Sequence, residues 1–309
     1  MNRTHVHSAA DNLFNGMGPE PAWGTAVTLI AEISPSYDFA VLRMIFDDVL
    51  RLFHGEYPGF YRIKTPYHNL SHTLDVFTCA VRLIHGMYHA GTRLTDREMT
   101  LAMAATLLHD VGYAQSTEST ETGTGAQFTP IHVPRGIEFM YRYAATHGIP
   151  ADFAADLAPV ISCSDPMLSV TRIDFADDRI RLAGQVVGTA DLVGQMADRN
   201  YLEKLVLLFQ EFQEANMGNY ASVHDMMRKT EGFHAKIRKK LDEDFAGLYH
   251  HLSTHFKVAL GEERNLYMES ISKNMEYLAK VTTMDESEYL AHLRRGGIVR
   301  QFLSSPSSQ

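Results

Sequence analysis

The chain has 309 residues, of which 45% are hydrophobic and 21% are charged. These proportions are typical of a globular protein and exclude a disordered or collagen-like chain. Its 37 acidic residues outnumber the 28 basic ones and give a formal charge of -9, which argues against binding to a nucleic-acid polymer or to anionic lipid.

Two cysteines, Cys79 and Cys163, are too few for a disulfide framework, which indicates a reducing compartment. The start of the chain is polar, and no apolar run approaches the ~18 residues of a membrane span. We therefore expect a cytoplasmic protein with no membrane contact. The 16 histidines favour nitrogen and oxygen ligands for any bound metal.

Amphipathic patterns predict helices in chain order. Apolar residues recur at helical spacing over residues 41–53 and again over 202–212. Between them, Thr95 and Glu98 have the spacing of a capping box that begins an apolar helix over 99–108.

The C-terminal region repeats these signals. Thr283 and Glu286 have capping-box spacing before a helix over 289–293, which Gly296-Gly297 would end. The tail 304–309 is predicted to be frayed. Sustained strand alternation and linkers are missing from the sequence, so we predict an all-α fold and a single helical domain spanning 1–309.

The densest group of polar residues begins at Tyr67. His68 and His72 are four residues apart, so on a helix both imidazoles project from the same face. Two such histidines can share a site, but His85 and His89 have the same spacing a few turns later. The spacing alone is therefore weak evidence for function.

A second polar group, His109-Asp110, follows the apolar helix predicted over 99–108. An imidazole and a carboxylate at the end of a buried helix cost free energy unless partners satisfy them. A divalent cation would do so, and the alternative is a hydrogen bond between the two side chains and groups at the helix end. Asp191 adds a carboxylate within an apolar run, where the alternative is an N-cap or an exposed loop position. Together with His72, these residues make a set suited to a divalent metal with water in the open positions.

Residues 116–130 are a polar stretch rich in threonine and glycine directly after His109-Asp110. Its length predicts a functional loop, and we consider it a candidate lid. Arg135 follows soon after and can bind a substrate phosphate through two parallel hydrogen bonds, although an exposed arginine at a helix start is the simpler interpretation.

These motifs resemble the HD superfamily of metal-dependent phosphohydrolases, whose signature is a distant histidine, an adjacent His-Asp and a later aspartate. The sequence is similar in particular to the class I cyclic-nucleotide phosphodiesterases, whose first motif reads Tyr-His-Asn, two residues, His, and then Asp-Val. Here the motif is Tyr67-His68-Asn69, His72 and Asp75-Val76, and His109 follows 37 residues after His72. The resemblance covers about residues 60–195 and implies an HD-domain helical bundle, with a catalytic core at about 40–260 and additional helices at both ends.

The resemblance also implies a ligand set. His72, His109, Asp110 and Asp191 would hold a first metal, and Asp110 would bridge to a second. His132 is similar to the extra ligand of HD subfamilies with two metals, and the alternative is a histidine that contacts solvent at a helix start. We therefore expect one or two divalent ions, which can be Mn, Zn, Mg or Fe.

The resemblance places a general acid at His68. Metal-generated hydroxide would attack phosphorus in line while His68 protonates the leaving oxygen. We therefore predict a metal-dependent phosphodiesterase that hydrolyses a cyclic nucleotide or other small phosphodiester, with His68 and Asp110 as its catalytic residues. Its partner would be a small, nucleotide-like substrate.

The sequence departs from the family pattern at three places. No further histidine follows His-Asp in 111–115, and none occurs in 161–165, so a second metal would be weakly held or rich in water. Thr230 stands where the phosphodiesterases have the glutamine that reads the purine. Phe233 is a candidate clamp on the base, but core packing is the simpler interpretation.

Two other functions remain open. A di-iron oxygenase of the same superfamily would use a similar ligand set but needs more histidines than we can assign. A non-catalytic, metal-stabilised nucleotide-binding module is the second alternative. Three further histidines lack a carboxylate at a suitable spacing and receive no role: His250, His251 and His255. The oligomeric state cannot be predicted from the amphipathic helices.

Overall fold

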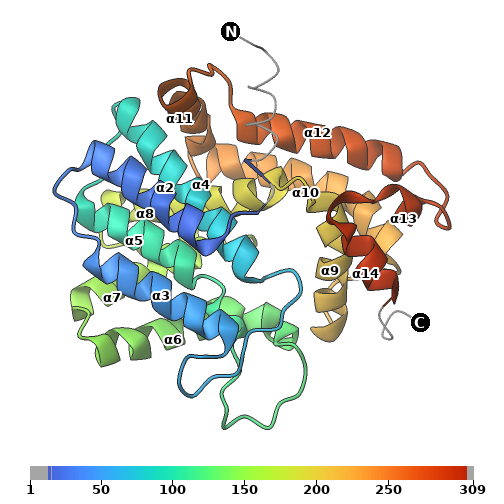
Figure 1. Cartoon of the computed structure of the whole chain (residues 1–309), viewed down its shortest axis with the longest axis horizontal. Helices are drawn as coiled ribbons and strands as arrows, with labels where there is room; N and C mark the ends of the chain where they lie inside the picture. The colour runs from blue at the N-terminus through green and yellow to red at the C-terminus, as the bar shows by residue number, and fades with distance from the viewer. Residues whose placement is uncertain (1–12, 15, 305–309) are drawn as a thin grey trace.

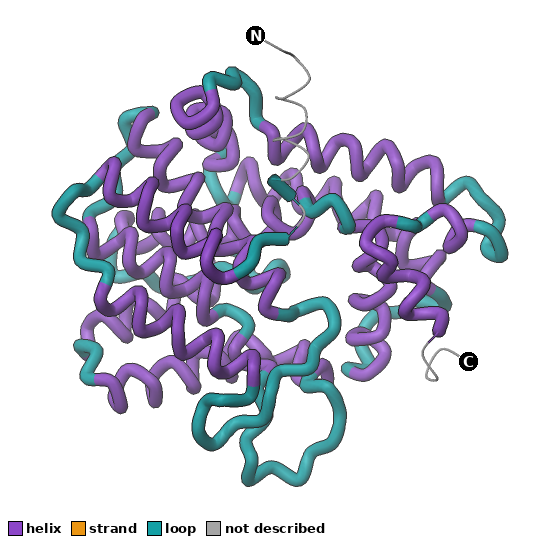
Figure 2. Tube along the Cα trace, in the orientation of Figure 1, coloured by secondary structure: helices purple, strands orange, loops and turns teal. Residues whose placement is uncertain are grey.

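The computed structural model describes residues 13–14 and 16–304. Over these residues the chain is all-α, as predicted, and none of them lies in a strand (Figure 2). Phe60 and Ser116 form an isolated antiparallel bridge. The predicted frayed tail lies outside the described residues, apart from Ser304 at the end of the last helix.

Most helices follow one another with short connections, whereas residues 55–69, 109–131 and 163–177 form longer ones. The α-helices are α2 (Pro19–Ile33), α3 (Ala40–His54), α4 (Leu70–His89), α5 (Asp96–Leu108), α6 (His132–His147), α7 (Ala151–Ser162), α8 (Asp178–Ala197), α9 (Tyr201–Glu214), α10 (Val223–Glu243), α11 (His251–Leu260), α12 (Leu266–Val281), α13 (Tyr289–His292) and α14 (Ile298–Ser304). Short 3-10 helices are η1 (Val111–Tyr113), η2 (Ala126–Ile131), η3 (Val170–Arg172), η4 (Leu248–His250) and η5 (Arg295–Gly297).

Helix α4 lies at the centre of the fold. It contacts α2, α5, α8 and α11, and it is buried along nearly its whole length (Figure 1). Helix α8 packs against α4, α5, α7 and α12, and it is also mostly buried. A helix that is apolar on most sides must be covered on most sides, and this requirement explains why α4 and α8 form the core.

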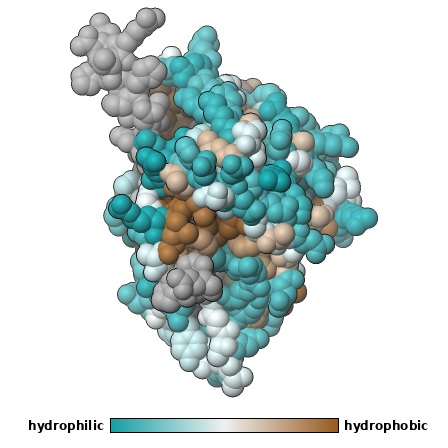
Figure 3. All heavy atoms as spheres, turned by 90° about the vertical axis from the view of Figure 1, so that its right-hand side faces the viewer, coloured by the Kyte–Doolittle hydropathy of each residue, from teal (hydrophilic) through white to brown (hydrophobic). Residues whose placement is uncertain are grey.

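The remaining helices cover this core. Helix α3 packs on α5, and α6 packs on α7 and η1. Helix α9 contacts α10, α14 and η2, and α9, α13 and α14 lie on the right-hand side of Figure 1. Seen from that side, the surface is mostly hydrophilic with one apolar area near its centre (Figure 3).

Most local predictions are confirmed. The pattern over 41–53 corresponds to α3, and the pattern over 202–212 corresponds to α9. The capping box is present, since the Thr95 hydroxyl accepts from the backbone of Glu98 and the Glu98 carboxylate accepts from the backbone of Thr95.

The second predicted capping box is wrong. Helix α13 begins at Tyr289, as predicted, but its N-cap is Glu288 without a side-chain cap, and the Thr283 hydroxyl donates to the Lys280 carbonyl at the end of α12. Gly296 has a φ of 62° and lies beyond α13, so it marks the turn before α14 and does not end the predicted helix.

The polar stretch 116–130 is only partly a loop. The loop itself ends at Gly125. Ala126–Ile131 form the 3-10 helix η2, in which Ala126 and Phe128 are buried. Gly125 makes this turn with a φ of 106°, and a Cβ at this position would lie 2.5 Å from the Tyr113 carbonyl oxygen. Thr124 is attached to α9, because its backbone N–H and its hydroxyl both donate to the Glu214 carboxylate, at 2.8 and 2.9 Å. The role of this loop as a lid stays a prediction.

None of the described helices combines the length and the apolar character that a membrane span requires.

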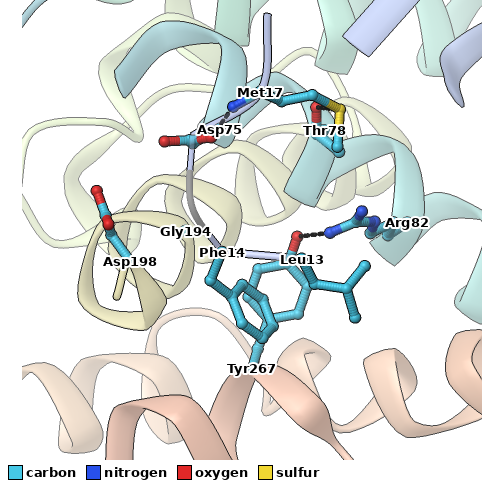
Figure 4. A pocket seen from close by; sticks show the side chains of 9 residues that line it. All are labelled: Leu13, Phe14, Met17, Asp75, Thr78, Arg82, Gly194, Asp198 and Tyr267. Atoms are coloured by element: carbon cyan, nitrogen blue, oxygen red, sulfur yellow. Dashed lines mark hydrogen bonds between the residues drawn. The ribbon is translucent and has the colours of Figure 1, made fainter. Parts of the chain in front are cut away.

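A small cavity lies between α4, α8 and α12 (Figure 4). Its volume of about 10 Å³ is close to that of one water probe, so it is too small for a substrate. Asp75 lies at this cavity and accepts a hydrogen bond from the backbone N–H of Met17, and burial raises the pKa of its carboxyl to about 7. Arg82 donates to the Tyr267 hydroxyl in the same place.

The close contact of α4 with α11 gives a test of this packing. A Cβ on Gly86 would lie 2.0 Å from the His251 carbonyl oxygen, whereas a Cβ on Gly24 in α2 would meet nothing within 4 Å. We expect Gly86→Ala to lower the free energy of unfolding by about 1–3 kcal/mol through steric overlap. Gly24→Ala should raise it by about 0.5–1 kcal/mol because alanine favours a helix. Urea unfolding of both variants checks this, and equal stability would contradict the described packing.

Candidate metal centre

Four side chains from three buried helices meet at one point. His72 lies in the first turn of α4, where the Asn69 side chain caps the helix by accepting from the backbone N–H of His72. His109 and Asp110 directly follow α5, and Asp191 lies within α8. All four are buried, so the convergence that was predicted from the sequence is present.

The polar atoms of His72, His109 and Asp110 have the spacing of ligands around one ion, and Asp191 Oδ1 lies beside the two imidazoles. His72 Nε2 lies 3.2 Å from His109 Nε2, 3.4 Å from Asp110 Oδ2 and 3.4 Å from Asp191 Oδ1. His109 Nε2 lies 3.1 Å from Asp110 Oδ2 and 3.9 Å from Asp191 Oδ1. Ligands about 2.0–2.2 Å from a metal are separated by about 3.0–3.5 Å at adjacent tetrahedral or octahedral positions. The cluster of His72, His109 and Asp110 can therefore bind a metal.

The hydrogen bonds orient the imidazoles as metal ligands. His109 Nδ1 lies 2.8 Å from the Thr106 carbonyl oxygen, and His132 Nδ1 lies 2.7 Å from the Thr129 carbonyl oxygen. A carbonyl only accepts, so each Nδ1 carries a hydrogen, and each ring can offer the Nε2 lone pair to a metal once that nitrogen is unprotonated. Asp110 Oδ2 is buried and accepts no hydrogen bond, which is the state of a carboxylate oxygen that a cation would satisfy.

A glycine brings His132 close to this cluster. A Cβ on Gly112 would lie 1.8 Å from the His132 carbonyl oxygen, so only glycine allows η1 to approach the start of α6 this closely. His132 Nε2 then lies 3.9 Å from Asp110 Oδ1. This is the carboxylate oxygen that does not face His72 and His109, since both of them face Oδ2. This position is compatible with the predicted ligand of a second metal.

His68 lies beside the cluster and is held by Glu211 from α9. Its Nδ1 lies 2.5 Å from Glu211 Oε2, while Glu211 Oε1 accepts from the backbone N–H groups of Tyr67, at 2.6 Å, and His68, at 3.1 Å. The Tyr113 ring packs against both His68 and His132, with centroid distances of 4.9 and 4.8 Å, and the two imidazole centroids are 6.2 Å apart. The orientation of His68 is therefore set on its edge by a buried carboxylate and on its face by an aromatic ring.

The electrostatics favour positive charge at this place. Burial disfavours the charged form of His109, but Asp110 and Asp191 outweigh burial and raise its pKa to about 9. Burial likewise opposes protonation of His68, but Glu211 and Asp110 raise its pKa to about 9. Burial lowers the pKa of His132, which favours its neutral ring. Against burial, the neighbouring histidines, His109 first, hold the pKa of Asp110 well below its usual range.

The cluster is most exposed to solvent on the side of His68 and His132. The His68 and His132 side chains are 17% and 16% exposed, whereas those of His109 and Asp110 are each 2% exposed. A metal held by the buried ligands would therefore have its remaining positions on the side of His68 and His132.

Two predicted substrate residues lie in other surroundings. Arg135 donates to the carbonyls of Gly112 and Ala114, at 2.9 and 3.0 Å, and its guanidinium lies 3.6 Å from the centre of the Phe128 ring. These contacts support the turn after Asp110, and binding of a phosphate by Arg135 stays a prediction. The expected core packing of Phe233 is wrong, because its position on the outer face of α10 leaves it 41% exposed. Its role as a base clamp stays a prediction.

Sequence reasoning missed Glu211 and Tyr113. Glu211 lies off the apolar stripe predicted over 202–212, so the pattern gave no reason to bury it, yet it is almost fully buried. Tyr113 lies three residues after Asp110. An aromatic residue close to the His-Asp motif was the only sign in the sequence that it could belong to the site. Both residues become recognisable only when α9 and η1 are placed beside His68.

A family model described as Npun_R2479-like matches residues 114–241. This match covers less than half of the chain and includes three residues of the site: His132, Asp191 and Glu211. The other ligands, His72, His109 and Asp110, precede the matched range. Neither the curated proteins nor the solved structures contain a match to this chain.

Removal of one buried carboxylate should abolish metal binding at this cluster. We expect Asp110→Asn to lose the Mn²⁺ bound by the wild type, because a neutral amide replaces the carboxylate whose Oδ2 lies 3.1 Å from His109 Nε2 and 3.4 Å from His72 Nε2, and Asp191 lies outside this group of three. At about 100 times its dissociation constant, the ion should add about 2.7 kcal/mol to the free energy of unfolding of the wild type only. Metal content after dialysis and thermal unfolding provide the measurement. Asp75→Asn, which changes a buried aspartate of α4 outside the cluster, is the matched control. Equal Mn²⁺ content in the two variants would contradict the assignment.

Proposed function

We propose that the chain is an HD-type metal-dependent phosphohydrolase that acts as a phosphodiesterase. The observation that carries this proposal is the combination of a two-histidine, two-aspartate cluster with a carboxylate-bound histidine beside its open side. Metal clusters alone occur in many protein classes. A histidine held for proton donation next to one is specific to a reaction with a leaving group.

The residues fit the metals that this class requires. His72, His109, Asp110 and Asp191 would hold the first ion, and the second Asp110 oxygen with His132 would hold the other. When bound, divalent ions polarise phosphoryl oxygens and lower the pKa of a coordinated water. The donor set of nitrogen and carboxylate oxygen accepts Mn, Zn, Mg or Fe.

The chain's own residues supply the proton for the leaving group. Hydrolysis of a phosphodiester forms one P–O bond with water and breaks one P–O bond to an alcohol, whose oxygen needs a proton. His68 remains protonated at neutral pH because its pKa is raised to about 9. Its Nδ1 is engaged with Glu211, so its Nε2 is the donor. Glu211 and Tyr113 restrict the ring to one orientation, which reduces the entropy lost in reaching the transition state.

The proposed substrate class rests on the net charge of the chain. We infer a small, nucleotide-like phosphodiester and not a polymer, because the net charge of -9 opposes an extended polyanion. A single phosphoryl group can be neutralised locally by the metals. Cyclic nucleotides belong to this class, but Thr230 is buried and donates to the Met226 carbonyl, so it does not substitute for a purine-reading glutamine.

A di-iron oxygenase is less well supported by the same geometry. It would need further histidine ligands, and in the described part of the chain His132 is the one additional imidazole within 4 Å of a carboxylate of the cluster. Oxygen consumption by the ferrous protein distinguishes the two reactions. A non-catalytic nucleotide-binding module would retain metal and show neither activity.

The general acid has a diagnostic dependence on the leaving group. We expect His68→Ala to retain its metal and to hydrolyse an alkyl phosphodiester about 10²–10⁴-fold more slowly than the wild type. An activated aryl ester, whose leaving group needs no proton, should be affected far less. Steady-state rates on both esters, with metal analysis and His54→Ala as the control, test this. Full activity of His68→Ala on the alkyl ester would remove the assigned role.

Glu211 should control the alkaline limit of turnover. Its negative charge raises the pKa of His68, so protonated His68 persists to higher pH. In Glu211→Gln this charge is absent while the acceptor oxygen remains, and we expect the alkaline limb of kcat/KM to shift about 1–2 pH units downward. Glu203→Gln, another buried glutamate of α9, should leave the limb in place. An unchanged profile in Glu211→Gln would show that this pair does not set the protonation of the acid.

A further inference from the structure

A second histidine cluster lies at the junction of α2, α4 and α11. His85 and His89 occupy one face of α4 near its end, and Glu32 reaches them from α2. His255 of α11 contacts His85 from the other side, since their Nδ1 atoms are 3.2 Å apart. Figure 1 shows these helices together at the upper left of the molecule. At the helical rise of 1.5 Å per residue, His85 is about 20 Å along α4 from His72, so the two clusters are separate.

We propose that Glu32, His85 and His89 form a second metal site that binds a divalent transition-metal ion, with zinc as its best match. Glu32 Oε1 lies 3.5 Å from His85 Nε2 and 3.4 Å from His89 Nε2. Ligands about 2.0–2.1 Å from a tetrahedral ion are about 3.3–3.4 Å apart, so all three atoms can reach one ion with small adjustments.

The state of His85 is an independent indication of a ligand. The side chain is fully buried, yet its Nε2 has no hydrogen-bond partner. Such a group costs free energy in a folded protein unless another partner satisfies it. The atom points toward the Glu32 carboxylate at a distance too long for a good hydrogen bond but suitable for two ligands of one cation.

His255 can hold His85 in the tautomer that a metal requires. The contact joins two Nδ1 atoms, and both rings are buried, so one nitrogen donates and the other accepts. When His85 donates, its Nε2 holds a lone pair that faces Glu32, an arrangement that is repulsive without a cation. Ligating histidines commonly donate their other ring N–H to a neighbour in this way.

The ligand types and exposure select the kind of ion. Two imidazoles with one carboxylate favour zinc and related transition metals over magnesium or calcium, which prefer oxygen ligands. His85 is buried while Glu32 and His89 reach the surface, so a fourth position would face solvent and hold water. Since Glu32 and His89 belong to different helices, a bound ion would join α2 to α4 and stabilise the fold.

Zinc binding in the Asp110→Asn background tests this site separately from the first cluster. Equilibrium dialysis with Zn²⁺ alone should find one equivalent bound to Asp110→Asn, with a rise in the unfolding temperature. Adding His89→Ala or Glu32→Gln should weaken this binding by at least about 10-fold and remove the rise. Matched controls are His54→Ala for the histidine and Glu20→Gln, on the same helix as Glu32. Both change exposed residues and should leave zinc binding unchanged.

The outcomes separate the two clusters. If Asp110→Asn binds no zinc, or if His89→Ala and Glu32→Gln bind it as tightly as their controls, the second site is wrong whatever the first cluster does. If the Asp110→Asn protein binds as many ions as the wild type while His89→Ala removes one, the second site is supported and the first assignment fails. Substitution of Co²⁺ adds a spectroscopic check, since loss of its visible bands in His89→Ala identifies His89 as a ligand.

Discussion

The burial of two carboxylates among imidazoles is the constraint on which the site depends. Asp110 and Asp191 lie where three largely apolar helices meet, and an ionised carboxylate in such surroundings costs several kcal/mol unless positive charge compensates it. The nearby histidines supply part of this compensation, as the raised pKa of His109 indicates. The same arrangement of negative charge and nitrogen lone pairs is what a divalent cation requires. Stability of the core and affinity for a metal are therefore two results of one charge balance.

The precision of the cluster comes from local backbone devices. His109 and His132 each donate from Nδ1 to a carbonyl three residues earlier, one at the end of α5 and the other at the end of η2. Each ring is thus oriented by a hydrogen bond within its own segment and not by the other segment. Gly112 then permits the two segments to approach within a distance that any side chain would prevent. Local orientation and close approach together place five polar side chains around one point.

Much of this arrangement could be read from the sequence, and the limits have physical reasons. Helices α3 and α5 follow from periodicity and capping, which are local properties. Asp191 was identified because a carboxylate in an apolar run must be compensated. Glu211 escaped because burial of a residue outside the apolar stripe depends on which helix packs against it. The signal at Thr283 failed because its hydroxyl found a nearer acceptor at the end of α12. The spacing of His85 and His89 was visible in the sequence. Their partner Glu32 was not, because its position depends on how α2 packs against α4.

Helix α4 links the two histidine clusters, since it carries His72 in its first turn and His89 at its last residue. Its continuous backbone hydrogen bonds make it stiff along its axis. A stiff helix moves largely as one rigid body, so a shift or rotation at one end also displaces the other end. Whatever anchors the far end therefore also limits how His72 can move relative to α5 and α8, and the alignment of the candidate metal ligands becomes a property of the entire helix.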